Sequence, residues 1–422
     1  MARSHLTNAA LGGIQAVVEA RRALRLGPAE LDRSQPQRLT RLVEHARARV
    51  PFYRKLYAAH GLSESPALTD LPVVSKHLMR QSDADDLVAS GVSRAELHRQ
   101  YTSGSTGEPF EIYTSPACDA SRHAISVLIQ ADHRLQMDER TLLLSPLGRK
   151  TPPGAPRIIA YRRDLGHMLR ELAELQATSL SGFPSYFGLL AEENARAGSP
   201  LRVKLAVCVG ENLDAPTREL IERSLAERVV QIYGLQEVGV VGYECPERRG
   251  FHVHPDFMLE ILGEDGRPVA QGEGESSLGE VCVTALGQYP MPFIRYNTRD
   301  LAALDRAPCP CGSRSPRLTR LSGRDGMPFT AKGGEKVSLG TLPFSWHFPG
   351  QLHRVSILQR EVGVLEIEVV PSEHADSEAL ARALHDHLSV LYGGQFDYRL
   401  RVTAPDFARA PGKRFAMRSL VG

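Results

Sequence analysis

The chain has 422 residues, so we expect two or three domains. Hydrophobic residues make up 42% and charged residues 24%, a composition typical of globular proteins. The 51 basic and 49 acidic residues nearly cancel, and no block of like charge occurs, which argues against electrostatically driven binding to nucleic acid or to membranes. The first thirty residues lack a signal-peptide pattern and no stretch approaches about 18 apolar residues, so the sequence predicts a cytoplasmic protein.

The N-terminal region, about residues 1–100, is predicted to be a helical platform. One helix is marked by apolar residues at helical spacing, and Pro51 is expected to end it. The apolar positions are Leu39, Leu42, Val43, Ala46 and Val50.

Residues 110–260 alternate short apolar runs with helical stretches. A strand is predicted at 203–210, a helix at 215–228 and a second strand at 229–233. Strand, helix and strand of these lengths indicate a crossover unit, and therefore an α/β layered architecture.

The pattern changes after residue 256. Two strand-like runs within 257–286, joined by turns rich in Gly and Asp, predict a β-rich subdomain over about 256–324. The block 350–403 shows strand, strand, helix and strand, which predicts a small α+β module. The expected fold class is α/β, with a large multi-layer N-terminal domain and a small α+β C-terminal domain.

The segment 102–107 combines hydroxyl residues with glycines. Successive backbone N–H groups in such a turn form a concave anion site, and the hydroxyls add donors. The spacing of a Walker loop is absent, so the segment by itself predicts either a phosphate cradle or a solvated turn. Its residues are Thr102, Ser103, Gly104, Ser105, Thr106 and Gly107.

Further motifs follow this loop in a fixed order. In this combination they resemble the adenylate-forming superfamily of acyl-CoA synthetases, adenylation enzymes and luciferases. The segments "RLVEHARARVPFYRKLY" and "CPCG" resemble the phenylacetate–CoA ligase branch of that superfamily. The motifs are GEN at 210–212, YGLQE at 233–237, YNTRD at 296–300, GRD at 323–325 and PGK at 411–413.

The resemblance implies that the loop 102–107 holds the β- and γ-phosphates of ATP. A lysine commonly lies at or near the end of this loop in the family, where this chain has Glu108 and Phe110. Backbone donors and Mg²⁺ are therefore expected to hold the phosphates here. The resemblance assigns Glu237 to Mg²⁺, and the assignment fits the preference of this hard cation for carboxylate oxygens.

The remaining nucleotide contacts are also carried over from the family. Tyr233 and Gly234 are implied at the adenine face, and Gly210 and Glu211 at the adenine-side loop. Asp300 is implied as the acceptor for the ribose hydroxyls, because one carboxylate can accept two hydrogen bonds. The resemblance also implies that Arg324 contacts the nucleotide.

The resemblance places a hinge at Asp325, between a large domain of residues 1–324 and a mobile lid of residues 325–422. The catalytic candidate is Lys413, which in the family bridges the substrate carboxylate and the α-phosphate. Two anions that react need a positive charge between them. Without the other motifs, Lys413 would be interpreted as an exposed tail lysine.

The implied reaction is ATP-dependent activation of a carboxylic acid, aryl or small acyl, to an acyl-adenylate, followed by transfer to the thiol of CoA or of a phosphopantetheine arm. A carrier-protein-loading or amide-forming adenylating enzyme is the alternative within the same class. The alternative outside the enzymes is a catalytically inactive homologue that binds the nucleotide. Phe183 and Tyr186 are candidates for the acid pocket or for plain core, and a homodimer is left open.

Three of the six cysteines gather with a histidine in two short segments. Cys245 and His252, with Cys309 and Cys311, offer a tetrahedral Cys₃His set for a structural Zn²⁺, and reduced packed thiols are the alternative. His254 competes with His252 as the fourth ligand.

Overall fold

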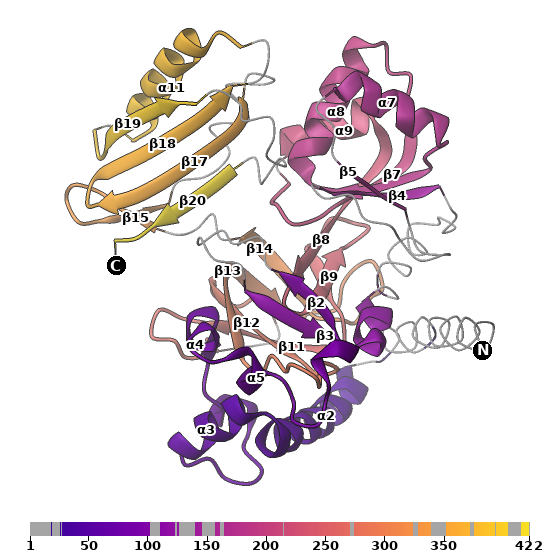
Figure 1. Cartoon of the computed structure of the whole chain (residues 1–422), viewed down its shortest axis with the longest axis vertical. Helices are drawn as coiled ribbons and strands as arrows, with labels where there is room; N and C mark the ends of the chain where they lie inside the picture. Colours follow the sequence, from indigo (N-terminus) through magenta and orange to yellow (C-terminus); the bar gives the residue numbers. More distant parts are fainter. Residues whose placement is uncertain are drawn as a thin grey trace. The chain divides into compact units, whose positions relative to one another are not determined.

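The computed structural model divides into two compact units, one of residues 1–137 and 232–321 and the other of residues 138–231 and 322–422 (Figure 1). The predicted boundary at 324/325 stays a prediction. The residues that the structure describes are 18, 26, 28–101, 110–122, 125, 140–145, 157–160, 164–213, 215–270, 274–323, 328–338, 352–371, 375–392, 394–403 and 415–421.

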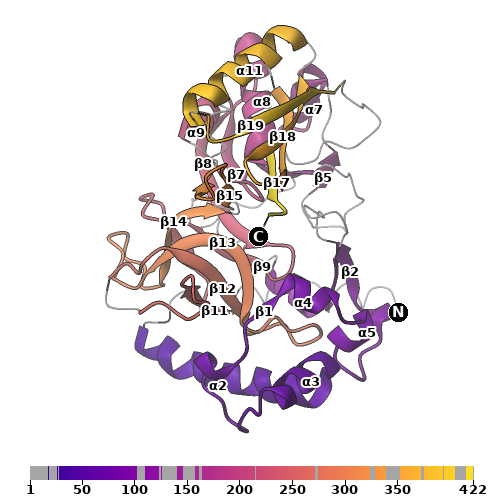
Figure 2. The ribbon, with the colours of Figure 1, turned by 90° about the vertical axis from the view of Figure 1, so that its left-hand side faces the viewer.

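The first unit begins with the predicted helix. All five predicted apolar positions are buried, and four of them lie in helix α2 (Pro28–Arg49). The fifth, Val50, forms a one-residue break before Pro51, which starts helix α3 (Pro51–Ala59). This fits the fixed φ of proline, which suits the first turn of a helix. The two helices pack together, as Figure 2 shows. The short helices that follow are η1 (Leu68–Asp70), α4 (Lys76–Arg80), α5 (Ala84–Leu87) and η2 (Arg94–Glu96).

The predicted β-rich segment forms most of the sheet of this unit. The strand order is β11-β12-β13-β14-β10-β9-β8, and the short strand β1 (Val74–Ser75) pairs in parallel with β13. A separate hairpin of β2 (His98–Tyr101) and β3 (Glu111–Thr114) flanks the segment 102–109 in sequence. The strands of the sheet are β8 (Ala226–Leu235), β9 (Gly239–Glu244), β10 (Phe251–Val253), β11 (Phe257–Leu262), β12 (Gly279–Ala285), β13 (Tyr296–Asp305) and β14 (Arg317–Gly323).

The crossover unit predicted in the second unit is confirmed. Strand β7 (Val203–Cys208) leads through helix α9 (Ala215–Ser224) into β8, and the two strands are parallel. The predicted bounds were wrong at one point, because the helix ends at Ser224 and residues 226–228, predicted to be helical, already belong to β8. The apolar faces of α7 (Leu165–Glu174), α8 (Pro184–Arg196) and α9 share one core with these strands. The other parallel strands are β4 (Thr141–Ser145), β5 (Arg157–Ala160) and β6 (Ser179–Gly182).

The predicted α+β module is likewise confirmed. Its sheet has the order β19-β18-β17-β20, and helix α11 (Ser377–Tyr392) packs on it through Leu380, Leu384 and Leu388 (Figures 1 and 2). The strands are β17 (Leu352–Glu361), β18 (Val364–Pro371), β19 (Asp397–Val402) and β20 (Phe415–Ser419), with a hairpin of β15 (Pro328–Thr330) and β16 (Lys336–Ser338).

Strand β8 pairs in parallel with β7 through residues 226–231 and antiparallel with β9 through residues 232–235. The predicted fold class, α/β, is therefore confirmed, and the large sheet has both parallel and antiparallel strand pairs. Among the residues that the structure describes, no helix has the length and apolar character to cross a membrane.

Candidate active site

Glu237 lies in the tight turn between strands β8 and β9. Its side chain is 3% exposed, and its Oε1 accepts a hydrogen bond of 2.9 Å from the hydroxyl of Tyr296. The ammonium of Lys76 lies 3.1 Å from the same oxygen. Strand β1 explains this meeting, because its parallel register pairs Val74 with Tyr296 and so directs the following Lys76 toward the turn.

These contacts fix the charge of Glu237. Burial is the largest influence on its pKa and would raise it, but the charge of Lys76, the backbone N–H of Glu237 and the Tyr296 hydroxyl together outweigh burial. The pKa of Glu237 is therefore lowered, and the carboxylate is ionised at neutral pH. A buried, ionised carboxylate of this kind is suited to a hard divalent cation.

The backbone of the same turn is held by Arg122 and Gln288. The Arg122 guanidinium donates to the Glu237 carbonyl at 2.8 Å and to the Gln288 side-chain oxygen at 3.1 Å. The Gln288 amide also donates to the Glu237 carbonyl, at 3.1 Å. Gly239, with φ of +89°, leaves room for Arg122, since a Cβ there would lie 2.7 Å from the arginine Cγ.

Tyr233 and Asp300 form a second buried pair in this unit. The Tyr233 hydroxyl donates to Asp300 Oδ2 at 2.8 Å, and both side chains are 7% exposed. Thr298 accepts a hydrogen bond from the backbone N–H of Asp300 at 3.1 Å. Next to Tyr233, Gly234 lies at an irregularity of the β8–β9 pairing, where a Cβ would come within 3.0 Å of the Gly239 carbonyl.

The second unit holds the other predicted adenine-side and acid-side residues. Glu211 Oε2 accepts a hydrogen bond from the backbone N–H of Ser185 at 3.2 Å, in the first turn of α8. Gly210 has φ of +79°, and a Cβ there would lie 2.9 Å from the Phe183 ring, so the glycine allows this close packing. Tyr186 is buried in the core of this unit, and Phe183 packs against that core.

Several predicted residues lie outside the part of the chain that the structure describes. They are the loop residues Thr102–Gly107, Arg324 at the end of the nucleotide motifs, the hinge candidate Asp325 and the catalytic candidate Lys413.

The four predicted metal ligands meet in the first unit. Cys245 follows β9, His252 lies in β10, and Cys309 and Cys311 lie between β13 and β14. One ligand atom from each lies within 4.8 Å of the others. The Sγ atoms of Cys245 and Cys309 are 3.6 Å apart, and Cys311 Sγ is 3.2 Å from His252 Nε2. Zn–S bonds of about 2.3 Å at tetrahedral angles give ligand separations near these values.

The competing ligand His254 has a different environment. Its Nδ1 accepts a hydrogen bond from the backbone N–H of Asp256 at 3.2 Å, and burial lowers its pKa, so its imidazole is neutral. The structure brings His252, and not His254, into the cluster.

Comparison with known proteins decides the family. The sequence model described as "AMP-binding enzyme" matches residues 154–289. A phenylacetate–coenzyme A ligase of Thermus thermophilus is 29% identical over 405 residues, which is 84% of this chain and 90% of the relative. The phenylacetate–coenzyme A ligase of Escherichia coli is 32% identical over 323 residues, covering 70% of this chain and 71% of the relative.

The chain belongs to the phenylacetate–coenzyme A ligase branch of the adenylate-forming superfamily. The resemblance seen in the sequence is thereby confirmed. The fold itself also has a counterpart among solved structures. A crystal structure of 2-hydroxyisobutyryl-CoA ligase in the postadenylation state matches with a TM-score of 0.70 at 21% identity, over 94% of this chain and 91% of that chain.

Four residues that contact Glu237 were not identified from the sequence. Tyr296 belongs to the YNTRD motif, and its place in that motif was the available signal. Lys76, Arg122 and Gln288 lie in segments without a motif, and only the tertiary fold brings them to Glu237.

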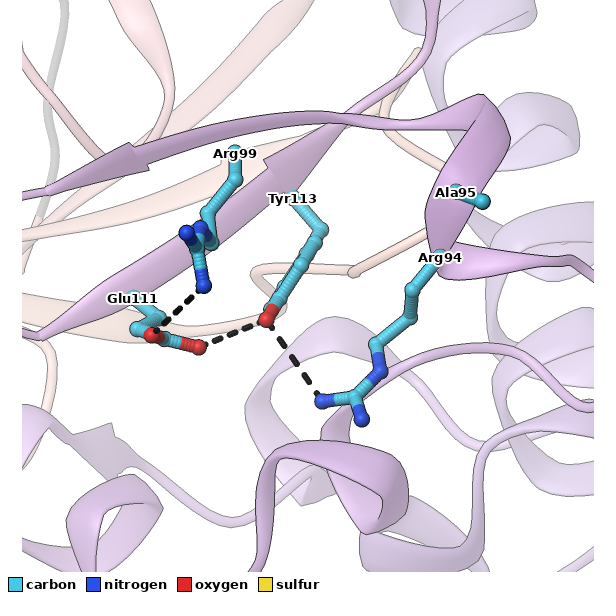
Figure 3. Close-up of a pocket in the computed structure, with 5 residues that line it drawn as sticks. All are labelled: Arg94, Ala95, Arg99, Glu111 and Tyr113. Atoms are coloured by element: carbon cyan, nitrogen blue, oxygen red, sulfur yellow. Dashed lines mark hydrogen bonds and ion pairs between the residues drawn. The ribbon is translucent and has the colours of Figure 1, made fainter.

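A cavity of about 340 Å³ opens elsewhere in the first unit, beside β2 and β3 (Figure 3). Its cations are paired, because Arg94 lies 3.1 Å from Asp85 and Arg99 lies 3.6 Å from Glu111. The cavity therefore offers no excess positive charge to an anion. Its lining residues are Arg94, Ala95, Arg99, Glu111 and Tyr113.

Proposed function

We propose that the protein is an AMP-forming acid–CoA ligase. A carboxylate attacks the α-phosphate of ATP to give an acyl-adenylate and pyrophosphate, and the thiol of CoA then displaces AMP. The observation that carries the proposal is the pairing of two chain segments in the first unit, in which Tyr233 binds Asp300 and Glu237 binds Tyr296. These are residues of the YGLQE and YNTRD motifs, and both pairs are buried.

Each site residue then has a chemical role. Tyr233 and Gly234, with Gly210 and Glu211, would surround the adenine, and Asp300 would accept hydrogen bonds from the ribose. The loop Thr102–Gly107 would donate backbone and hydroxyl hydrogen bonds to the β- and γ-phosphates. Arg324 would reach the nucleotide as well.

Glu237 would hold Mg²⁺, whose charge offsets that of the phosphate oxygens. Lys413 would neutralise the charge that develops as the carboxylate meets the α-phosphate. Rotation of the C-terminal module about Asp325 would bring Lys413 in for the first half-reaction and withdraw it for the second.

The proposed acid is an arylacetate or a related aryl acid, in line with the relatives named phenylacetate–coenzyme A ligase. Phe183, whose ring packs on Gly210, is the proposed wall residue of the acid pocket. Tyr186 remains a candidate, although its burial in the core also fits a purely structural role. The proposed acceptor is CoA, and a phosphopantetheine arm is the alternative. The proposed compartment is the cytosol. Whether the protein forms a homodimer is left open.

We further propose that Cys245, His252, Cys309 and Cys311 hold a structural Zn²⁺. The chemistry of the donor set fits this ion, since three sulfurs and one imidazole nitrogen lie within 4.8 Å of one another. The N–H of Glu247 donates to Cys245 Sγ at 3.4 Å, a contact that stabilises a thiolate. Four protein ligands leave no open position, so this ion would stabilise the fold and take no part in the reaction.

The test is carboxylate-dependent exchange of labelled pyrophosphate into ATP, with a panel of phenylacetate, benzoate, 2-hydroxyisobutyrate and acetate. We expect phenylacetate or another aryl acid to stimulate exchange most, and thioester to form when CoA is added. Exchange that occurs without thioester formation, with hydroxylamine as the better acceptor, would favour the carrier-loading or amide-forming alternative. No exchange with any acid, together with retained ATP binding, would favour the inactive homologue.

A further inference from the structure

The turn between strands β8 and β9 is held by an arginine from another part of the chain. Arg122 follows strand β3 in sequence, and its guanidinium donates to the carbonyl oxygens of Gln236 at 3.4 Å and of Glu237 at 2.8 Å. These two carbonyls belong to the peptide units on either side of the Glu237 Cα atom. Because peptide units are planar, holding both of them fixes φ and ψ of Glu237, and with them the direction of its side chain.

The stem of Arg122 follows a fixed path across this turn. It passes over Gly239, where a Cβ would lie 2.7 Å from the arginine Cγ and 3.0 Å from its Cδ. Any side chain at position 239 would therefore push the stem away. The glycine also has φ of +89°, a backbone conformation that other residues rarely adopt.

Gln288 supports the same turn from a third segment. Its side-chain oxygen accepts a hydrogen bond from Arg122, and its amide donates to the carbonyls of Glu237 and Met291, each at 3.1 Å. The Glu237 carbonyl thus receives two hydrogen bonds, one of them from a charged donor, and charge-assisted bonds are the stronger kind. The backbone at Glu237 cannot rotate without losing both.

The charge of Arg122 and its geometry have opposite effects on a metal site. Its hydrogen bonds go to backbone oxygens, whereas the Glu237 carboxylate is held by the Tyr296 hydroxyl at 2.9 Å. The guanidinium and the carboxylate also interact through their charges, so the guanidinium would repel a divalent cation bound by Glu237. Electrostatics alone therefore predicts that removing Arg122 strengthens Mg²⁺ binding, while a positioning role predicts the opposite.

We propose that Arg122 is a positioning residue for the activation step, because its guanidinium holds the two peptide units around Glu237 and so directs the carboxylate at the Mg²⁺ of Mg·ATP. This inference rests on the proposed function. Arg122 would act through Glu237 and not by contact with the nucleotide. Its loss should weaken the magnesium-dependent part of ATP binding and leave the binding of metal-free ATP nearly unchanged.

The test compares Arg122→Met and Arg122→Lys with the unmodified protein by isothermal titration calorimetry, with ATP as ligand in excess Mg²⁺ and again in EDTA. The ratio of the two affinities is the magnesium-linked gain. For Arg122→Met we expect the gain to fall by about tenfold, the lower end of the range for replacing a group that orients a metal-binding side chain. Arg122→Lys keeps the charge but loses the planar fork, so the gain should fall there as well.

Arg38→Met is the matched control, because Arg38 lies in the same unit and also donates to a backbone carbonyl, that of Pro255 at 3.4 Å. It should leave the magnesium-linked gain unchanged, even where it lowers the melting temperature. Glu237→Gln is the reference for complete loss of the gain. Circular dichroism checks the fold of each variant, and if Arg122→Met does not fold, Arg122→Lys decides the comparison because it keeps the charge and an unbranched stem over Gly239.

An unchanged or larger gain in Arg122→Met, or a full gain in Arg122→Lys, would overturn the positioning role. A full gain in Glu237→Gln, or an unmodified protein that binds no ATP, would instead overturn the proposed function, so the two failures are distinguishable.

Discussion

Arg317 places a positive charge directly against the cysteine–histidine cluster. Its side chain is 6% exposed, and its guanidinium donates one hydrogen bond to Cys309 Sγ at 3.2 Å and another to the carboxylate of Asp305. In the β10–β14 pairing it lies opposite His252. Three thiolates around Zn²⁺ carry a net charge of about −1, which is costly to bury without a partner. We infer that Arg317 would stabilise the cluster with the proposed Zn²⁺ bound.

Replacing Arg317 by Met should therefore lower the zinc affinity by about 10- to 100-fold, the range seen when residues that orient metal ligands are replaced. The measurement is the equilibrium transfer of zinc to a colorimetric chelator, after elemental analysis has established the zinc content of the unmodified protein. Arg320→Met is the control, because Arg320 lies on the same strand but is exposed and 3.9 Å from Glu275. Equal transfer from both variants would contradict the role of Arg317.

The sequence selected candidate residues that stand in a motif, and it did not identify the residues that contact Glu237. Glu237, Tyr233 and Asp300 could be selected because each stands in a short characteristic string. Lys76 and Arg122 have no such string, since β1 is only two residues long and the helix with Arg122 carries no motif. Their contacts with Glu237 depend on the register of β1 against β13 and on the packing of Arg122 against Gly239.

The pair of strands β9 and β10 is the element on which the cluster depends. Gly242 on β9 lies opposite Val253 on β10, and a Cβ at Gly242 would come within 2.6 Å of the carbonyl oxygen of His252. The carbonyl oxygen of His252 cannot move aside by a rotamer change, as the end of a flexible side chain can. A larger residue at this position must move β10, and with it the His252 ring.

We predict that Gly242→Ala destabilises the protein by about 1–3 kcal/mol, the usual cost of forcing an extra methyl group into a packed site. It should also speed zinc loss. Chemical denaturation with and without a chelator measures both effects. Gly274→Ala serves as control, because no atom lies within 4 Å of a Cβ at that position. Unchanged stability and zinc retention in Gly242→Ala would show that β10 can shift without cost.

The elements themselves were largely predictable, for physical reasons that differ along the chain. The helix that Pro51 ends and the β7-α9-β8 crossover follow from apolar spacing and from proline geometry, which act locally. The order of the strands does not follow from such signals. Strand β10 has three residues, and β14 inserts between β13 and β10 through pairings far apart in sequence, so the sheet became known only from the structure.

At the scale of the whole molecule, the proposed reaction separates into two steps with different demands on Lys413. We predict that Lys413→Ala slows adenylate formation by about 100- to 1,000-fold, as is typical when one group that stabilises the transition-state charge is lost. Thioester formation from a supplied acyl-adenylate should survive, because that step involves no attack on a phosphate. Pyrophosphate exchange measures the first step, and CoA thioester formation from synthetic adenylate measures the second. Equal loss in both steps would contradict the assigned role.

The parallel pairing of β20 with β17 has a consequence for folding during synthesis. The sheet order β19-β18-β17-β20 puts the last of its strands in chain order beside the first one. During synthesis, β17 keeps an unpaired edge until residues 415–419 emerge from the ribosome, and such edges recruit other chains. Lys413 stands two positions before β20. A prematurely terminated product that lacks the lysine would therefore also lack the protecting strand, and we expect it to aggregate more readily than the whole chain.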